Sequence, residues 1–349
     1  MKIIVATSSV PFIRGGAEIL ADNLRDAFVA AGHEAELVSI PFKHYPPARI
    51  PDHILACRLL DLTETCGVRI DRVIGLKFPA YLIPHPDKVI WLLHQHRTAY
   101  ELWDHPRAGD LIQCPDGPVI REAIRQADRE LIPEAKAVYT LSKNVSGRLR
   151  RYSGIDSEPL YNPPAHAQLF YNGPAGDYFF FPSRITGIKR QWLAIRALAQ
   201  CREQVRICFA GQADSPMQQA ECVNIVRELK LSDRVEWLGM VSEEQKRALY
   251  ANCLAVIFSP VDEDYGYVTL EAMLSSKPVI TCADSGGPLE FVVDRETGLV
   301  ADPSPESLAQ AMDALWTDRR CAAAMGDAGC ARYQDLNISW ANVVEKLLC

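Results

Sequence analysis

The chain has 349 residues, which exceeds the size at which a single hydrophobic core keeps growing, so we expect two domains. Hydrophobic residues make up 48% and charged residues 23% of the chain, the profile of a soluble globular protein, and its net charge of -7 argues against a nucleic-acid binder. The 11 cysteines form no C-x-x-C pair, and neither a secretory signal nor a membrane-length apolar run is found, so we predict a reduced, cytoplasmic protein.

The N-terminal half alternates predicted strands and helices. The apolar run Ile3 to Ala6 predicts a buried parallel strand, and a Gly-containing loop leads from it into a helical pattern that Gly32 ends. Further strands are predicted at 36–40, 72–75, 88–93 and 137–140, and a helix at 142–151. Prolines and glycines are frequent across 159–175, so we place the end of the first domain, 1–165, in this segment.

The same alternation restarts in the C-terminal half. Strands are predicted at 178–181, 205–210, 234–238, 255–258 and 278–281, and helices at 192–200, 242–252 and 270–275. This gives a second domain, 166–330, followed by a C-terminal helical segment, 331–349. Both halves are therefore predicted to be doubly wound α/β sheets, which bind ligands at the carboxyl ends of their strands.

The stretch from Pro260 to Met273 carries the most chemistry. Glu263 lies in a predicted loop, Gly266 in a turn, and Glu271 is expected in the first turn of the following helix. Two carboxylates can bind the paired hydroxyls of a sugar, and a helix N-terminus favours a phosphate. Taken alone, the two residues can also be ordinary surface acids.

Three further motifs follow this stretch in order: Lys277-Pro278-Val279-Ile280, Ser285-Gly286-Gly287-Pro288-Leu289-Glu290 and Thr297-Gly298-Leu299-Val300. Together with Glu263 and Glu271, they resemble the C-terminal motifs of the retaining GT-B glycosyltransferases of family 4. The resemblance implies a GT-B fold, with two Rossmann-like domains facing across a cleft and the last helix packing back toward the N-terminal domain. Two departures are Ser276, where the family has Gly, and Tyr161-Asn162-Pro163-Pro164 at the hinge.

The resemblance also implies which residues bind the donor. Arg184 and Lys189 match the cations that hold the donor diphosphate, and fixed cations stabilise a leaving diphosphate. The loop Ile13-Arg14-Gly15-Gly16-Ala17-Glu18 matches the family's glycine-rich loop. His94 matches a histidine that contacts the transferred sugar, with His96 as the alternative. The predicted catalytic residues are Glu263, His94, Arg184 and Lys189, and the predicted donor-binding residues are Gly15, Gly16, Arg184, Lys189, Gly211, Met240, Val241, Glu263, Tyr265, Gly266, Tyr267, Val268 and Glu271.

The function implied by this resemblance is retaining transfer of a hexose from a UDP- or GDP-linked sugar to a glycan or glycolipid, in the synthesis of a cell-surface polysaccharide such as lipopolysaccharide. No metal or other cofactor is expected, because the two cations replace Mg²⁺, although Asp262 and Asp264 flank Glu263. A nucleotide-sugar epimerase of the same architecture and an inactive nucleotide-sugar-binding module remain as alternatives. The basic residues Lys143, Arg148, Arg150 and Arg151 indicate either a solvated helix face or contact with an anionic membrane.

Overall fold

The computed structural model describes residues 1–12 and 15–349, and these form two compact units. Unit 1 consists of Met1–Ala165 and Ile338–Cys349, and unit 2 of His166–Asn337. The C-terminal boundary differs from the predicted segment 331–349, because helix α10 continues to Asp335 and only the residues after Asn337 belong to unit 1.

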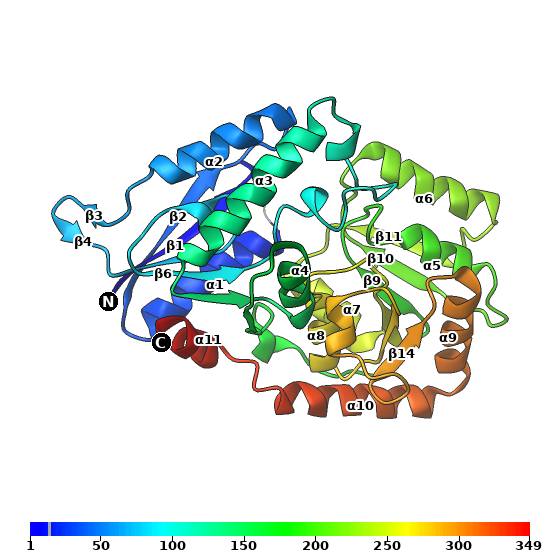
Figure 1. Cartoon of the computed structure of the whole chain (residues 1–349). Coiled ribbons are helices and arrows are strands. Elements are labelled where there is room, and N and C mark those ends of the chain that lie inside the picture. The colour runs from blue at the N-terminus through cyan, green and yellow to red at the C-terminus, as the bar shows by residue number, and fades with distance from the viewer. Residues whose placement is uncertain (13–14) are drawn as a thin grey trace. The chain divides into compact units, whose positions relative to one another are not determined.

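Unit 1 is built on a parallel sheet with the strand order β2-β1-β5-β6-β7-β8 (Figure 1). The predicted strands are present, and the helices at 50–59 and 117–131 were not predicted. The strands are β1 (Lys2–Ser9), β2 (Glu34–Pro41), β5 (Arg72–Gly75), β6 (Lys88–Leu92), β7 (Ala137–Thr140) and β8 (Glu158–Pro159), with a small hairpin of β3 (Glu64–Thr65) and β4 (Val68–Arg69). The helices are α1 (Gly16–Ala30), α2 (Ile50–Leu59), α3 (Gly117–Leu131), α4 (Lys143–Ser153) and α11 (Trp340–Leu348).

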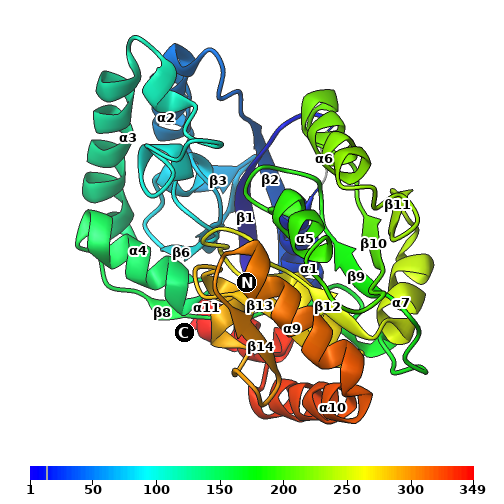
Figure 2. The ribbon, with the colours of Figure 1, turned by 90° about the vertical axis from the view of Figure 1, so that its right-hand side faces the viewer.

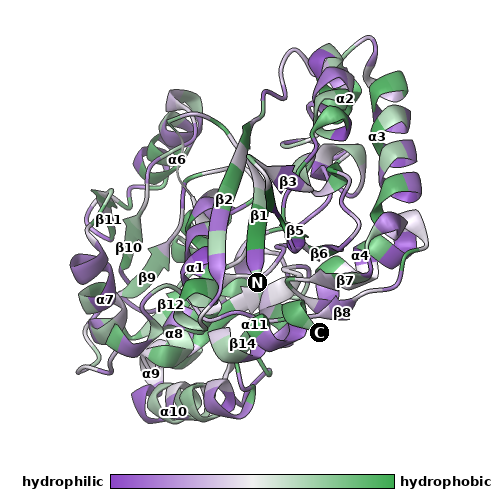
Figure 3. Cartoon of the chain, turned by 90° about the vertical axis from the view of Figure 1, so that its left-hand side faces the viewer, coloured by the Kyte–Doolittle hydropathy of each residue, from purple (hydrophilic) through white to green (hydrophobic). Residues whose placement is uncertain are grey.

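The central strands of the unit 1 sheet, β1, β5 and β6, are buried on both faces, as parallel strands usually are. Figure 3 shows β1 coloured hydrophobic along most of its length, and Ile3 to Ala6 are buried. Along β6, Ile90 and Leu92 pack with residues of α3 and α4. The side chain between them, Trp91, instead contacts Trp340 of α11 edge to face at 6.3 Å. The C-terminal helix is thereby part of the core of unit 1.

Unit 2 repeats this plan with the strand order β11-β10-β9-β12-β13-β14 (Figure 2). The strands are β9 (Phe179–Pro182), β10 (Ile207–Ala210), β11 (Val235–Gly239), β12 (Ala255–Ile257), β13 (Val279–Cys282) and β14 (Gly298–Ala301). The helices are α5 (Gln191–Leu198), α6 (Pro216–Glu228), α7 (Glu243–Asn252), α8 (Tyr267–Leu274), α9 (Pro305–Thr317) and α10 (Arg319–Asp335). Numbered from β9, the order is 3-2-1-4-5-6, the order of dinucleotide-binding folds.

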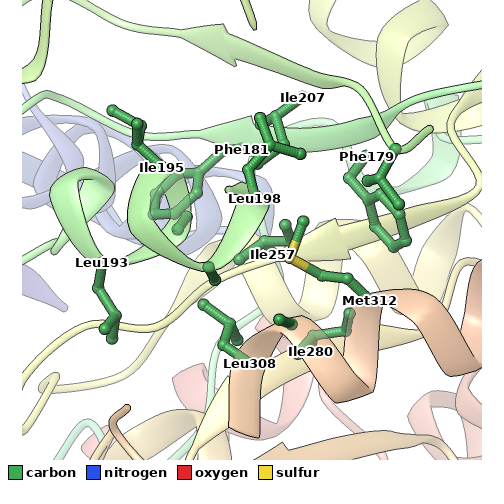
Figure 4. Packing of buried hydrophobic residues seen from close by; sticks show 14 of the residues in the cluster. Phe179, Phe181, Leu193, Ile195, Leu198, Ile207, Ile257, Ile280, Leu308 and Met312 are labelled. Carbon is green, nitrogen blue, oxygen red and sulfur yellow. The ribbon is translucent and has the colours of Figure 1, made fainter. Parts of the chain in front are cut away.

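The core of unit 2 follows from the alternation of side chains along β9. Phe179 and Phe181 point to one face of the sheet, where they pack with Leu193 of α5 and Met312 of α9 (Figure 4). Phe180 points to the opposite face and packs with residues of α7 and α8. Because successive strand residues alternate between faces, one apolar strand can bury side chains in both layers of helices.

Candidate functional site

The predicted site residues of unit 2 lie around the point where the strand order reverses. Strand β9 pairs with β10 on one side and with β12 on the other. The loops that follow β9 and β12 therefore diverge at the carboxyl edge of the sheet, which is where doubly wound folds bind their ligands. Arg184 and Lys189 follow β9, and Glu263 follows β12.

Lys189 and Glu263 are in direct contact. Lys189 Nζ lies 2.5 Å from Glu263 Oε2, and the two side chains are 15% and 17% exposed. The backbone of Glu263 is fixed as well, since its N–H donates to Ser285 O at 2.8 Å and its carbonyl accepts from Gly287 N–H at 2.8 Å. The structure thus brings together one predicted diphosphate ligand and one predicted sugar ligand.

Arg184 occupies a more open position. Its guanidinium donates to Asp214 Oδ1 at 2.7 Å, and both side chains are exposed. Two backbone hydrogen bonds join the loops that carry them, from Ile185 N–H to Gln212 O at 2.9 Å and from Asp214 N–H to Ile185 O at 3.2 Å. An exposed ion pair is weak, so Arg184 can exchange Asp214 for another anion at small cost.

Glu271 differs from its prediction. Helix α8 begins at Tyr267, directly after Gly266 with its φ of 91°, so Glu271 lies in the second turn of the helix and not in the first. Its carboxylate accepts from Lys246 Nζ at 3.0 Å and from Tyr250 Oη at 2.7 Å. Burial alone would lower the pKa of Lys246, but the charges of Glu271 and Glu243 outweigh it and the pKa is raised. Lys246 is therefore held in its charged form beside Glu271.

The remaining predicted donor-binding residues of unit 2 differ in how far their side chains are exposed. Gly211 follows β10 with a φ of 134°, and a Cβ there would lie 2.3 Å from Ser183 O, so this position requires glycine. Tyr265 is buried, with its ring against Tyr267 at 5.1 Å and Phe291 at 5.5 Å, so it contributes to packing. The other predicted ligands have more exposed side chains: Tyr267 and Val268 begin α8, and Met240 and Val241 lie in the loop between β11 and α7.

In the glycine-rich loop of unit 1, the Glu18 carboxylate binds the backbone. Ile13 and Arg14 lie outside the described residues. Gly15, a predicted donor-binding residue, is the N-cap of α1, and its N–H donates to Glu18 Oε2 at 2.9 Å. Burial would raise the pKa of Glu18, but the charge of Lys77 at 3.3 Å and the Gly15 hydrogen bond outweigh it and the pKa is lowered. Gly16, the first residue of α1, is exposed.

His94 and His96 have different surroundings. His94 Nδ1 lies 2.6 Å from Gln95 O. A carbonyl can only accept a hydrogen bond, so Nδ1 carries a proton, and in the neutral tautomer with this proton Nε2 is an acceptor. His96 packs against Phe42 at 6.1 Å and Phe78 at 5.3 Å, and burial lowers its pKa to about 4. The geometry favours His94 as the histidine with a polar role.

A buried carboxylate holds the loop of His94. Asp128 of α3 is fully buried and accepts from Tyr81 Oη at 2.8 Å, Tyr100 Oη at 2.7 Å and Gln95 Nε2 at 2.8 Å. Burial raises the pKa of Asp128 to about 6, although the three hydrogen bonds favour its charged form. This network was not predicted, because its members are far apart in sequence and form no motif.

The predicted basic face of α4 is wrong in one residue. Arg148 is buried and forms an ion pair with Glu101, so it belongs neither to a solvated face nor to a membrane-binding one. Lys143, Arg150 and Arg151 are exposed. Among the described residues, no helix is long and apolar enough to cross a membrane, and no group of three His, Cys, Asp or Glu residues could hold a metal ion. No disulfide links the cysteines of this part of the chain.

Comparison with known proteins gives consistent matches. Residues 173–332 match the family described as Glycosyl transferases group 1. The mouse protein named Alpha-1,3/1,6-mannosyltransferase ALG2 is 34% identical over 177 residues, which cover 46% of this chain and only 42% of the mouse protein. The matched segment therefore spans less than half of that relative's length.

Solved structures match over almost the whole chain. Sucrose-phosphate synthase from Thermosynechococcus elongatus has a TM-score of 0.78 at 18% identity, covering 99% of this chain and 97% of that one. Anabaena HepE, solved in complex with UDP and glucose, has a TM-score of 0.71 at 19% identity, covering 100% and 98%. At this identity the match shows the fold, which is GT-B. The chain therefore has a GT-B fold, and its residues 173–332 are similar to the glycosyl transferases group 1.

Proposed function

We propose that this chain is a retaining glycosyltransferase that moves a hexose from a nucleotide-diphosphate sugar to a glycan or glycolipid acceptor. The observation that carries the proposal is the contact between Lys189 and Glu263 at the switch point of the unit 2 sheet. A cation and a carboxylate fixed beside each other suit a ligand in which a diphosphate is joined to a polyol. The family match of this unit supports the same assignment.

In this proposal, Arg184 and Lys189 bind the diphosphate. Negative charge develops on the leaving nucleoside diphosphate, and cations already in place stabilise it without reorganisation. Lys189 has three N–H donors, so it can contact a phosphate and keep Glu263. Arg184 would exchange its exposed partner, Asp214, for a phosphate oxygen.

The carboxylates of unit 2 then bind the hydroxyls. Glu271, oriented by Lys246 and Tyr250, binds the ribose, and Glu263 binds the transferred sugar. His94 accepts a hydrogen bond from a sugar hydroxyl through Nε2. The acceptor oxygen bonds to the anomeric carbon on the face from which the diphosphate departs. The carbon–oxygen bond to phosphate breaks, and a phosphate oxygen takes the acceptor's proton.

The names of two similar proteins support the choice of donors to test first. The ALG2 name specifies mannosyl transfer, and HepE is described in complex with UDP. UDP- and GDP-linked hexoses are therefore the first candidates. We propose that the two cations neutralise the diphosphate without a metal ion and that the acceptor belongs to a cell-surface polysaccharide made at the cytoplasmic side of a membrane.

The first experiment is thermal unfolding of the full chain with UDP, GDP or ADP, each with Mg²⁺ and with EDTA. A nucleotide at 100 times its dissociation constant adds about 2.7 kcal/mol of stability, which is visible as a higher melting temperature. One nucleotide should raise the melting temperature equally with Mg²⁺ and with EDTA. A shift that EDTA removes would contradict the metal-free site, and no shift with any nucleotide would contradict the donor site.

Transfer is tested next with the matching nucleotide sugar and with Glu263→Ala. The variant should fold and lose transfer, whereas Glu296→Ala, at an exposed position of the same unit, should keep it. Full activity of Glu263→Ala would refute its role. A changed sugar still attached to the nucleotide would instead identify an epimerase, and binding without turnover of any donor would identify a binding module.

A further inference from the structure

Arg190 has an unusual combination of backbone and side-chain geometry. It is the N-cap of α5 with a φ of 60°, and it is 5% exposed. The left-handed conformation is unfavourable for a non-glycine residue. Such strain persists only where surrounding contacts impose it, and it is frequent at functional sites.

The contacts that impose it come from the guanidinium. Nη1 and Nη2 donate to the two carboxylate oxygens of Asp284 at 2.8 and 2.6 Å. Nε donates to Ser259 O at 2.6 Å and Nη2 to Pro260 O at 2.7 Å. A planar fork with this many fixed acceptors has a single orientation, which an ammonium group could not provide.

These contacts join three loops at the carboxyl edge of the unit 2 sheet, those after β9, β12 and β13. Backbone hydrogen bonds join the same loops, from Val261 N–H to Ile188 O at 2.8 Å and from Asp262 N–H to Asp284 O at 2.9 Å. Arg190 follows Lys189 directly in sequence. The loop it binds at Pro260 carries Glu263 three residues later.

We propose that Arg190, acting through Asp284, is a positioning residue that fixes the spacing between Lys189 and Glu263 and so sets the geometry of the donor site. This inference rests on the proposed function. Displacement of a reacting group by about 1 Å can cost about a hundredfold in rate, so loosening either loop should reduce transfer even in a folded protein.

A purely stabilising role predicts something different. Asp284 is 45% exposed, so solvent weakens its ion pair with the buried Arg190. If Arg190 only stabilised unit 2, weakening the pair would lower the melting temperature and leave the kinetics of the folded protein unchanged. The two roles are therefore separated by kinetics measured well below the melting temperature.

The test compares Arg190→Lys and Asp284→Asn with Arg234→Lys. The lysine variant keeps the charge and the backbone strain but loses the planar fork. Arg234 is a matched control, because it also donates to carbonyls of unit 2, Val205 O at 2.8 Å and Glu203 O at 3.0 Å, but at the amino edge of the sheet. Donor kcat/KM should fall about tenfold or more in the first two variants and change less than about twofold in the control.

A second measurement does not depend on activity. The acylation rate of Lys189 by an amine-reactive ester, read by peptide mass spectrometry, should rise several-fold in Arg190→Lys and Asp284→Asn but not in Arg234→Lys, because Lys189 would leave Glu263. Unchanged acylation and kinetics would overturn the proposal. If the wild-type chain transfers no sugar while acylation responds as expected, the positioning role stands and the proposed donor function fails.

Discussion

Replacing Tyr100 with phenylalanine tests whether Asp128 is ionised in the folded protein. The change removes one hydroxyl that donates to a fully buried carboxylate, at 2.7 Å, and leaves the ring in place. Tyr178→Phe is the matched control, because its hydroxyl donates to a neutral acceptor, Leu249 O, at 2.8 Å.

The expected loss of stability depends on pH. Burial raises the pKa of Asp128 from 3.8 to about 6, so the stabilising preference for the protonated form is complete below pH 3.8 and is lost as the pH rises through about 6. At pH 8 the carboxylate is charged, and losing a hydrogen bond to it should cost about 1.5–3 kcal/mol. At pH 5 the group is mostly protonated, and the cost should fall to about 1 kcal/mol. Because Tyr100 favours the charged form, the variant should also raise the pKa of Asp128 further.

The assay is urea unfolding of the full chain at pH 5 and pH 8, read by pulsed hydrogen exchange on peptides of each unit, since a two-unit protein need not unfold in one step. Peptides of α3 report Tyr100→Phe, and peptides of α5 report Tyr178→Phe. The control should lose about 1 kcal/mol at both pH values. Equal losses at the two pH values for Tyr100→Phe, or the same pH dependence in the control, would refute the reasoning.

Two further predictions concern positions with a clear geometric constraint. Gly211→Ala should lower the free energy of unfolding of unit 2 by about 2 kcal/mol, because the new Cβ would overlap Ser183 O. Gly147→Ala, at an exposed position of α4 with open space around it, should instead raise the free energy of unfolding of unit 1 by about 0.5–1 kcal/mol. Both are measured by denaturant unfolding, and equal effects of the two substitutions would refute this prediction. His94→Ala should reduce transfer about a hundredfold at an unchanged melting temperature, and His96→Phe, which keeps the aromatic packing, should retain transfer; the reverse result in a steady-state assay would assign the polar role to His96.

Most strands of the two sheets could be predicted because they contain short apolar runs, whereas β8 and β14 were not predicted. Phe179-Phe180-Phe181 is an example: no polar residue interrupts it, and the structure buries it on both faces. Several helices could not be predicted in this way. Helix α3 has a regular apolar stripe that includes Ile120 and Ile124. It starts directly after an irregular segment rich in prolines and glycines, so its first residue could not be recognised from the sequence.

The candidate site was predictable only where a residue belongs to a motif. Glu263 and Lys189 were found by their spacing, and their contact is visible only in the structure. Asp214 and Asp284 belong to no recognised spacing, and each meets its arginine only because β9, β10, β12 and β13 align their loops at one edge. The position of Glu271 was missed by one helical turn, because the left-handed φ of Gly266 lets α8 begin earlier than the apolar pattern indicates.

The buried charges of the two units follow a common physical rule. In each unit a buried charged group binds a loop that directly follows a strand: Asp128 binds Gln95 after β6, and Arg190 binds the loop of Ser259 and Pro260 after β12. Apolar residues of similar size at such positions are often as stabilising or more so, because burying a charge is costly. Stability alone therefore gives no reason for these charges. The directional hydrogen bonds of these charges do give a reason, because they fix the loops that carry His94 and Glu263. We infer that this fixed geometry serves the proposed transfer reaction.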